Sequence, residues 1–127
     1  MNTKTSGNLT ARWVDKIQEL HPRMEVQMLK ILGLIAANPD ISQKDLADRV
    51  GITLSSIGRN IDHLGPGGHR AKKGLGLVVR YEDPTDRRVT RFKLTKEGQK
   101  WWTEYCEVLE ELCEKTRGKD SKDSEVA

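Results

Sequence analysis

The segment from Asp40 to Leu64 constrains the fold of this chain most strongly, because it carries the signals of two short helices joined by a tight turn. Ser42 can cap the first helix, with Asp45 three residues later as a partial capping box. Gly51 follows, and glycine is the residue that most easily adopts the left-handed conformation that ends a helix. Thr53 can then cap the second helix. The segment therefore predicts a helix, a tight turn and a second helix.

The second helix is predicted to have one apolar and one polar face. Its apolar residues have the spacing of a single buried stripe, and they are Leu54, Ile57, Ile61 and Leu64. The opposite face carries hydroxyls and longer hydrogen-bonding groups, the types that contact base edges and phosphates. These residues are Ser55, Ser56, Arg59, Asn60 and His63. An ordinary solvated helix can carry the same face, so the pattern alone leaves both interpretations open.

A β-hairpin is predicted farther along the chain. Residues 78–82 (VVRYE) have the composition of a strand, and residues 83–86 (DPTD) are a turn signal. Residues 89–94 (VTRFKL) alternate like a second strand. Two short helices followed by a hairpin with a basic tip form a winged helix-turn-helix. We therefore predict an α+β fold that is mostly α-helical with a small β-hairpin wing.

Two stretches of the sequence resemble a known family. Residues 82–98, EDPTDRRVTRFKLTKEG, resemble the wing and following helix start of the MarR family of transcription regulators. Residues 41–64 are similar to the reading-helix region of that family, and the resemblance extends over about residues 25–98. It implies a DNA-binding winged helix with N- and C-terminal dimerisation helices. It also implies that Ile41 forms a short edge of the wing sheet.

The tip of the predicted wing carries Asp86, Arg87 and Arg88. The family resemblance implies that Arg88 enters the minor groove, where the negative potential is strongest. It implies that Asp86 orients the Arg88 guanidinium through a bidentate pair. Arg87 would contact a phosphate or substitute for Arg88. The alternative interpretation is a hairpin tip of solvated charges.

The spacer of residues 65–76 (GPGGHRAKKGLG) is longer than the usual family connection between reading helix and wing. Its glycines and proline predict a mobile segment. Arg70, Lys72 and Lys73 make it basic. It is therefore either a solvated flexible loop or a source of additional phosphate contacts.

Charge is distributed unevenly along the 127 residues, although the formal net charge is only +3. Residues 53–93 contain nine Lys/Arg and four Asp/Glu, whereas residues 94–127 contain six Lys/Arg and nine Asp/Glu. A concentration of basic charge is the electrostatic footprint of phosphate binding. Cys106 and Cys113 give no disulfide framework, and the sequence has neither a secretory signal nor a membrane-spanning apolar run. We expect a reduced cytoplasmic protein.

One domain is expected, with a flexible N-terminus and a disordered tail. The predicted parts are residues 1–8 (flexible), 9–117 (winged-helix domain) and 118–127 (disordered). Within the domain, they are 9–20 and 96–117 (dimerisation helices), 42–64 (helix-turn-helix) and 77–94 (wing). The apolar face of the last helix is wider than one small domain needs, so we expect burial against a second copy, although packing on its own core remains open. The dimerisation candidates are Trp13, Ile17, Trp101, Trp102, Tyr105, Val108, Leu109 and Leu112.

The sequence offers little support for an enzyme or for a bound cofactor. Its three histidines lack metal-ligand spacing with acids or cysteines, and no phosphate-cradling glycine loop follows a strand. We expect no catalysis, cofactor or metal. Members of the family often bind a small aromatic or lipophilic effector, and Trp13, Trp101 and Trp102 can line such a pocket. Packing in a dimer core is the favoured interpretation of these tryptophans.

The leading hypothesis is a sequence-specific regulator of transcription, a repressor, that binds a pseudo-palindromic site on double-stranded DNA as a homodimer. The first alternative is a winged-helix DNA-binding assembly factor in genome packaging or replication. The second is a winged-helix protein-interaction module. The basic, glycine-rich spacer resembles some phage-borne relatives, which hints at such an origin.

Overall fold

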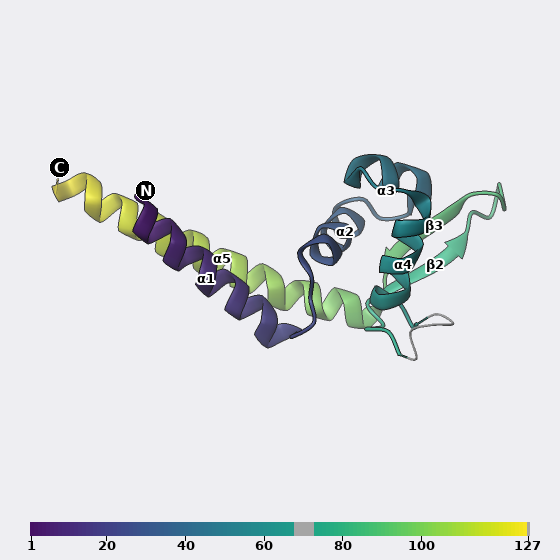
Figure 1. The fold of residues 1–127 in the computed structure, drawn as a ribbon, viewed down its shortest axis with the longest axis horizontal. Coiled ribbons are helices and arrows are strands. Elements are labelled where there is room, and N and C mark those ends of the chain that lie inside the picture. Colours follow the sequence, from purple (N-terminus) through teal and green to yellow (C-terminus); the bar gives the residue numbers. More distant parts are fainter. Residues whose placement is uncertain (68–72, 127) are drawn as a thin grey trace. The chain divides into compact units, whose positions relative to one another are not determined.

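The computed structural model describes the backbone of residues 1–67 and 73–126 and the side chains of residues 1–67 and 73–114. The described chain contains α1 (Thr3–Leu20), α2 (Val26–Ala37), β1 (Ile41–Ser42), α3 (Gln43–Val50), α4 (Leu54–Leu64), β2 (Val78–Glu82), β3 (Thr90–Leu94) and α5 (Lys96–Val126) (Figure 1). It divides into two compact units. The central unit is Glu25–Trp101, and the terminal unit comprises Met1–Met24 together with the residues from Trp102 onward.

The terminal unit consists of α1 lying alongside the later turns of α5 (Figure 1). Helix α1 begins at Thr3, so residues 3–8 of the segment that was expected to be flexible (residues 1–8) are helical instead. The reason is local, because Asn2 caps the helix by accepting a hydrogen bond from the Thr5 amide at 2.8 Å. Ile17 and Tyr105 are buried.

Helix α5 is longer than the sequence predicted. It continues to Val126, whereas the expected end was near Arg117 and the residues from Gly118 were expected to be disordered. A single glycine inside a helix costs only about 1 kcal/mol relative to alanine, and no proline follows it to end the helix. The glycine was therefore too weak a signal to place a helix end.

The central unit packs α2, α3 and α4 with a three-stranded antiparallel sheet of order β1-β3-β2 (Figure 1). Strand β3 is the middle strand, and its Phe92 pairs with Ile41 on one side and Arg80 on the other. The predicted α+β winged helix-turn-helix is confirmed, and so is the short edge strand at Ile41. Helix α2 begins at Val26, after a turn that is closed by a hydrogen bond from the Met24 amide to the His21 carbonyl at 3.1 Å.

The local signals of the helix-turn-helix are confirmed. Ser42 caps α3 by accepting from the Asp45 amide at 3.1 Å, and Thr53 caps α4 by accepting from the Ser56 amide at 3.1 Å. Gly51 ends α3 with a φ of 81°, in the left-handed region where a residue with a Cβ is strained. These bonds join residues three positions apart, so the chain sequence specifies them without help from distant segments.

The core of the central unit corrects one prediction about α4. Ile57, Ile61 and Leu64 are buried as expected, but Leu54 is 53% exposed. Leu54 is the first residue of α4, so its side chain lies at the end of the helix, beyond the buried stripe. The stripe that holds α4 therefore has three members. The fully buried side chains around it are Ile31, Leu32, Ile35, Leu46, Val78 and Phe92.

The two ends of the spacer are held together by backbone hydrogen bonds. The amides of Leu75 and Leu77 donate to the carbonyls of His63 and Leu64 at 2.8 and 2.7 Å, and the Gly76 amide donates to Gly65 at 2.9 Å. The described parts of the spacer are therefore paired, contrary to the expectation of a mobile segment throughout. Residues 68–72, which include Arg70 and Lys72, lie outside the described residues.

Close packing of Gly98 against Leu77 predicts the effect of an alanine substitution. A Cβ on Gly98 would lie 2.0 Å from the Leu77 carbonyl oxygen. We expect Gly98→Ala to lower the free energy of unfolding by about 1–3 kcal/mol through overpacking, despite the better helix propensity of alanine. Gly58→Ala is the matched control, because a Cβ there has no atom within 4 Å. It should leave stability unchanged or raise it by up to about 1 kcal/mol in urea denaturation. Equal effects of the two substitutions would contradict this packing.

Candidate nucleic-acid interface

The outward face of α4 is polar, as the sequence predicted. Ser55, Arg59 and His63 are exposed, and their positions one helical turn apart place them on one side of the helix. Ser56 and Asn60 are only partly exposed. Their side chains are also engaged within the helix, because Ser56 Oγ accepts from Thr53 Oγ1 at 3.1 Å and Asn60 Nδ2 donates to the Ser56 carbonyl at 2.8 Å.

Arg59 is the longest hydrogen-bond donor on this face. One guanidinium nitrogen donates to Ser56 Oγ at 3.4 Å, a long contact that leaves most of its donors directed to solvent. A guanidinium can form bidentate hydrogen bonds with a guanine edge or with a phosphate. The face therefore presents one strong donor flanked by a hydroxyl and an imidazole.

The wing tip contains the predicted pair of Asp86 and Arg88. Arg88 Nε donates to Asp86 Oδ1 at 3.0 Å and Nη2 donates to Oδ2 at 3.3 Å, which is a bidentate arrangement. The hydrogen bond from the Arg88 side chain, followed by that from the Arg88 amide, lowers the pKa of Asp86. The Arg88 side chain nevertheless remains 90% exposed. The pair therefore orients a guanidinium that is still open to a ligand.

Two further basic residues predicted for the interface are exposed. Arg87 lies beside Arg88 at the wing tip, and Lys73 lies at the described end of the spacer. Arg70 and Lys72, which were also predicted for the interface, lie outside the described residues. The candidate interface therefore consists of the α4 face, the wing tip and Lys73, all within the central unit.

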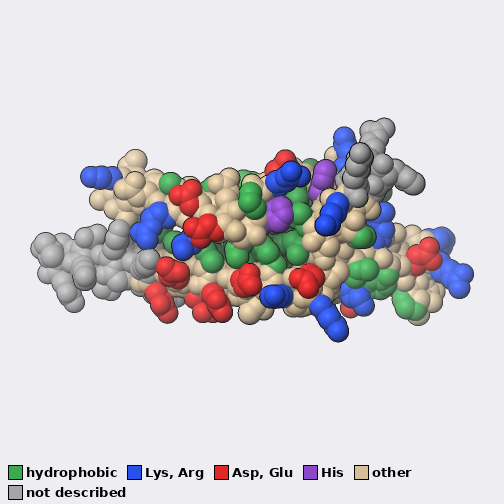
Figure 2. All heavy atoms as spheres, turned by 90° about the horizontal axis from the view of Figure 1, so that it is seen from below, with side chains coloured by type: hydrophobic (Ala, Val, Ile, Leu, Met, Phe, Trp, Pro, Cys, Tyr) green, Lys and Arg blue, Asp and Glu red, His purple; other side chains and the backbone are tan. Residues whose placement is uncertain are grey.

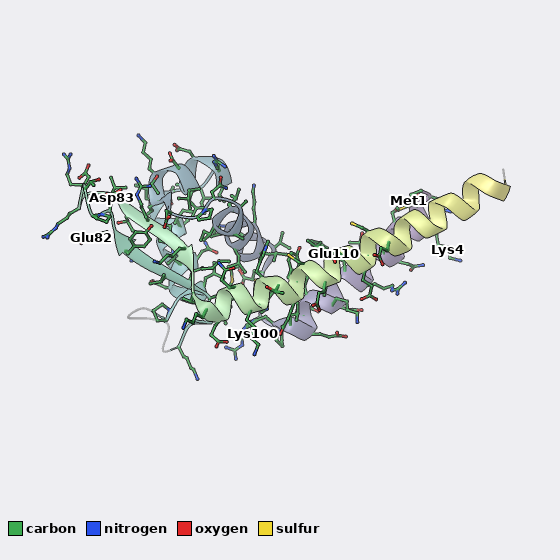
Figure 3. The ribbon with its side chains drawn as sticks, turned by 180° about the vertical axis from the view of Figure 1, so that it is seen from behind. Met1, Lys4, Glu82, Asp83, Lys100 and Glu110 are labelled. Carbon is green, nitrogen blue, oxygen red and sulfur yellow. The ribbon has the colours of Figure 1, made fainter. Side chains whose placement is uncertain are left out.

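The base of the wing contains a polar network that sequence reasoning missed. Arg91 Nε donates to Asp83 Oδ2 at 2.6 Å, and Arg91 Nη1 donates to the Asp40 carbonyl at 2.9 Å. The Tyr81 hydroxyl donates to the Asp40 carboxylate. Figure 3 labels Asp83 where strand β2 gives way to the wing turn. The sequence indicated only a turn at Asp83 and a strand at Arg91, because nothing local connects either residue to Asp40.

The dimerisation candidates differ in their exposure. Ile17, Trp101 and Tyr105 are buried within the single chain, whereas Leu109 is 37% exposed. The partly exposed members are Trp13, Trp102, Val108 and Leu112. Burial raises the pKa of Tyr105. Part of the apolar face is thus covered by the chain itself, and the part around Leu109 is exposed.

Other kinds of site find no support in the part of the chain that the structure describes. No group of three or more His, Cys, Asp or Glu side chains there is placed to hold a metal ion. None of the helices among the described residues is long and apolar enough to cross a membrane.

The ionisation of Asp83 predicts a specific pH dependence of stability. The hydrogen bond from the Thr85 hydroxyl, and next that from Arg91, hold the pKa of Asp83 well below its usual range. A carboxyl with a lowered pKa in the folded state stabilises the fold above its unfolded pKa, near about 4, and loses this contribution as the pH falls. We therefore expect Asp83→Asn to show a shallower loss of stability than the wild type between about pH 4 and pH 2 in thermal unfolding. Parallel curves for the two proteins would contradict this assignment.

Comparisons with known proteins agree with the geometry of the central unit. Residues 24–64 match the family described as winged helix-turn-helix DNA-binding. A MarR-like transcriptional regulator from Thermotoga maritima has a similar structure, with a TM-score of 0.72 and 26% sequence identity over 99% of this chain and 89% of that chain.

Two other solved structures share the fold. S. aureus MepR, solved as a complex with DNA, gives a TM-score of 0.70 at 19% identity over 97% of this chain and 94% of that one. NadR, solved in complex with 4-hydroxyphenylacetate, gives a TM-score of 0.69 at 23% identity over 97% and 80% of the two chains. The chain is therefore a winged helix-turn-helix protein with the fold of the MarR-like transcriptional regulators.

Proposed function

We propose that this protein is a sequence-specific regulator of transcription that acts as a homodimeric repressor on a pseudo-palindromic site in double-stranded DNA. The observation that carries the proposal is the combination, in one compact unit, of a capped helix with a polar outer face and a wing tip with an oriented arginine. The proposal assigns the protein a binding role and no catalytic one. Its place of action is the cytoplasm, beside the DNA that it reads.

Helix α4 is proposed to read sequence in the major groove. Its N-terminal residues enter the groove most deeply in helix-turn-helix complexes, which places Ser55 near the bases. Arg59 lies one turn farther along the same face and contacts a guanine edge or a phosphate. His63, another turn on, is nearer the backbone. Asn60 contributes less, because its amide already donates to the Ser56 carbonyl.

The wing is proposed to supply affinity at the flanks of the site. Arg88 would enter the minor groove, where narrow A·T-rich segments attract arginine. Asp86 would hold the guanidinium in place before binding, so less conformational freedom is lost on DNA. Arg87 and Lys73 would contact phosphates, as would Arg70 and Lys72 from the spacer. Phosphate contacts of this kind position a protein without reading sequence.

Surface charge supports placing DNA on the central unit. Exposed glutamates follow one another along α5 in the terminal unit, at Glu104, Glu107, Glu110 and Glu114. Figure 2 shows acidic side chains gathered over the long helices on one face. Such a surface repels phosphates, whereas the exposed arginines of α4 and the wing attract them. The terminal unit is therefore assigned to association between copies.

Association of two copies is proposed to use the apolar surface of the terminal unit. Val14 on α1 and Leu109 on α5 are 38% and 37% exposed, and Trp102, Val108 and Leu112 are partly exposed. Two copies would place their reading helices about 34 Å apart, one turn of the duplex. NadR was solved with 4-hydroxyphenylacetate, a small aromatic compound. We propose no such effector for this protein, because we assign the aromatic side chains of its terminal unit to packing.

Selection of DNA from a random pool tests the proposed function directly. The purified protein should enrich a short inverted repeat. Arg59→Ala should reduce binding to that repeat by about 1–3 kcal/mol, more than it reduces binding to unrelated duplexes, and should relax one symmetric pair of positions. Arg12→Ala removes one exposed positive charge in the terminal unit and serves as the control, with the selected repeat unchanged.

Two outcomes of the selection would count against the proposal. Enrichment of no sequence, with binding to all duplexes alike, would favour an assembly factor. Absence of binding to any duplex would favour a protein-interaction module. A repeat that is unchanged by Arg59→Ala would remove α4 from the reading role.

Sedimentation tests the proposed dimer. The wild type should sediment as two chains at micromolar concentration. Leu109→Glu should shift the protein toward one chain, because it places a charge in the proposed apolar contact. Val26→Glu makes a similar change at a residue of the central unit that is 81% exposed, and it should leave the dimer intact. Dissociation by both substitutions, or by neither, would contradict the proposed interface.

A further inference from the structure

We propose that Arg91 is a positioning residue, which fixes the wing hairpin in the orientation that Arg88 needs to reach DNA. Arg91 does so by joining Asp83 in the wing turn to Asp40 in the turn before β1. The inference rests on the proposed DNA-binding function and adds a residue that itself touches no DNA.

The Arg91 guanidinium contacts two segments that are far apart in sequence. Its Nε donates to Asp83 Oδ2 at 2.6 Å, and its Nη1 donates to the Asp40 carbonyl at 2.9 Å. The Arg91 and Asp83 side chains are only 31% and 13% exposed. Charge-assisted hydrogen bonds shielded in this way are stronger and more directional than those of a solvated surface pair. Arg91 thus connects the wing turn to the body of the central unit.

Asp40 is an anchor for both strands of the wing. Its amide donates to the Phe92 carbonyl of β3 at 3.1 Å, and its carboxylate accepts from the Tyr81 hydroxyl of β2. Its φ of 67° is in the left-handed region, which aspartate tolerates better than most residues. The turn before β1 therefore holds each wing strand by a separate contact.

Asp83 connects the Asp40 turn to the wing tip through hydrogen bonds. Its Oδ1 accepts from the amide and the hydroxyl of Thr85, both at 2.7 Å, and from the Asp86 amide at 3.2 Å. Asp86 in turn holds the Arg88 guanidinium. A continuous chain of hydrogen bonds thus leads from Asp40 through Arg91 and Asp83 to Arg88.

A wing needs such an anchor because two strands alone are only marginally stable in water. Strand β1 adds pairing at Ile41 and Ser42 only, opposite Phe92 and Arg91. Beyond that point no third strand among the described residues pairs with the hairpin, so its direction depends on side-chain contacts. Ordering the wing before DNA arrives reduces the conformational entropy lost on binding.

A double-mutant cycle between Arg91 and Arg88 tests the inference. The probe is a duplex carrying the selected repeat flanked by A·T pairs, and the readout is the dissociation constant of the full chain. In the wild-type background, Arg88→Ala should weaken binding by roughly 5- to 100-fold. In the Arg91→Lys background, which keeps the charge but cannot form the same two contacts, the loss caused by Arg88→Ala should fall to about threefold or less.

The matched control is Arg80→Lys on strand β2. The Arg80 guanidinium lies 6.0 Å from the centre of the Phe92 ring and takes no part in the hydrogen bonds to Asp40 or Asp83. In that background, Arg88→Ala should cause its full loss. Replacing the A·T flanks of the duplex by G·C pairs should raise the dissociation constant of the Arg91→Lys protein by a smaller factor than that of the wild type. The reason is that Arg88 on a displaced wing no longer reaches the minor groove.

Thermal unfolding shows whether the Arg91→Lys protein is folded. If it is not, a second variant provides the test. Tyr81→Phe removes only the hydroxyl that Asp40 accepts and should produce a smaller coupling with Arg88→Ala in the same direction. Additive losses in both backgrounds would overturn the inference and leave the proposed function standing. An Arg88→Ala protein that binds as tightly as the wild type would instead overturn the wing's proposed role, and the inference with it.

Discussion

The buried ring of Phe92 is the contact on which the rest of the central unit depends. Its side chain is fully buried, and the strand that carries it pairs with a partner on each side. Its carbonyl also accepts the amide of Asp40 and so joins the sheet to the turn that follows α2. Burial of an aromatic side chain of this size stabilises a small domain by about 3 kcal/mol. One residue therefore links the helices, the sheet and the base of the wing.

Packing against this core determines which face of α4 remains free. Ile57, Ile61 and Leu64 are buried, so the polar residues on the other side of the helix must face outward. The caps at both ends of the turn then fix where the helix starts. The proposed reading surface is thus a consequence of core packing. A substitution in the buried stripe would therefore change the position of Arg59 even though Arg59 itself is not substituted.

The wing is held in place by a different kind of interaction. Its buried apolar side chains, Leu77, Val78 and Phe92, lie at its base, so the geometry nearer the tip depends on charge-assisted hydrogen bonds. Arg91 and Asp83 form the partly buried pair at its base, and Asp86 and Arg88 form the exposed pair at its tip. An exposed pair alone contributes little to stability. In the proposed function the exposed pair orients a guanidinium, and the partly buried pair holds the base of the hairpin that carries it.

The sequence by itself determined the features that depend on neighbouring residues. The caps at Ser42 and Thr53, the left-handed Gly51 and the Asp86–Arg88 pair join positions no more than three apart, so local chemistry specifies them. The winged fold followed from the order of these local signals. Helix boundaries were less well predicted. Helix α5 continues past its predicted end near Arg117, because a single glycine lowers helix stability too little to end a helix.

Only the tertiary structure decided which distant groups meet. The contact of Tyr81 with Asp40 joins residues 41 positions apart, and that of Arg91 with Asp40 joins residues 51 positions apart, so no local pattern could reveal them. The exposure of Leu54 also depended on where the core ends. Both follow from the packing of segments brought together by folding, which local propensity does not contain.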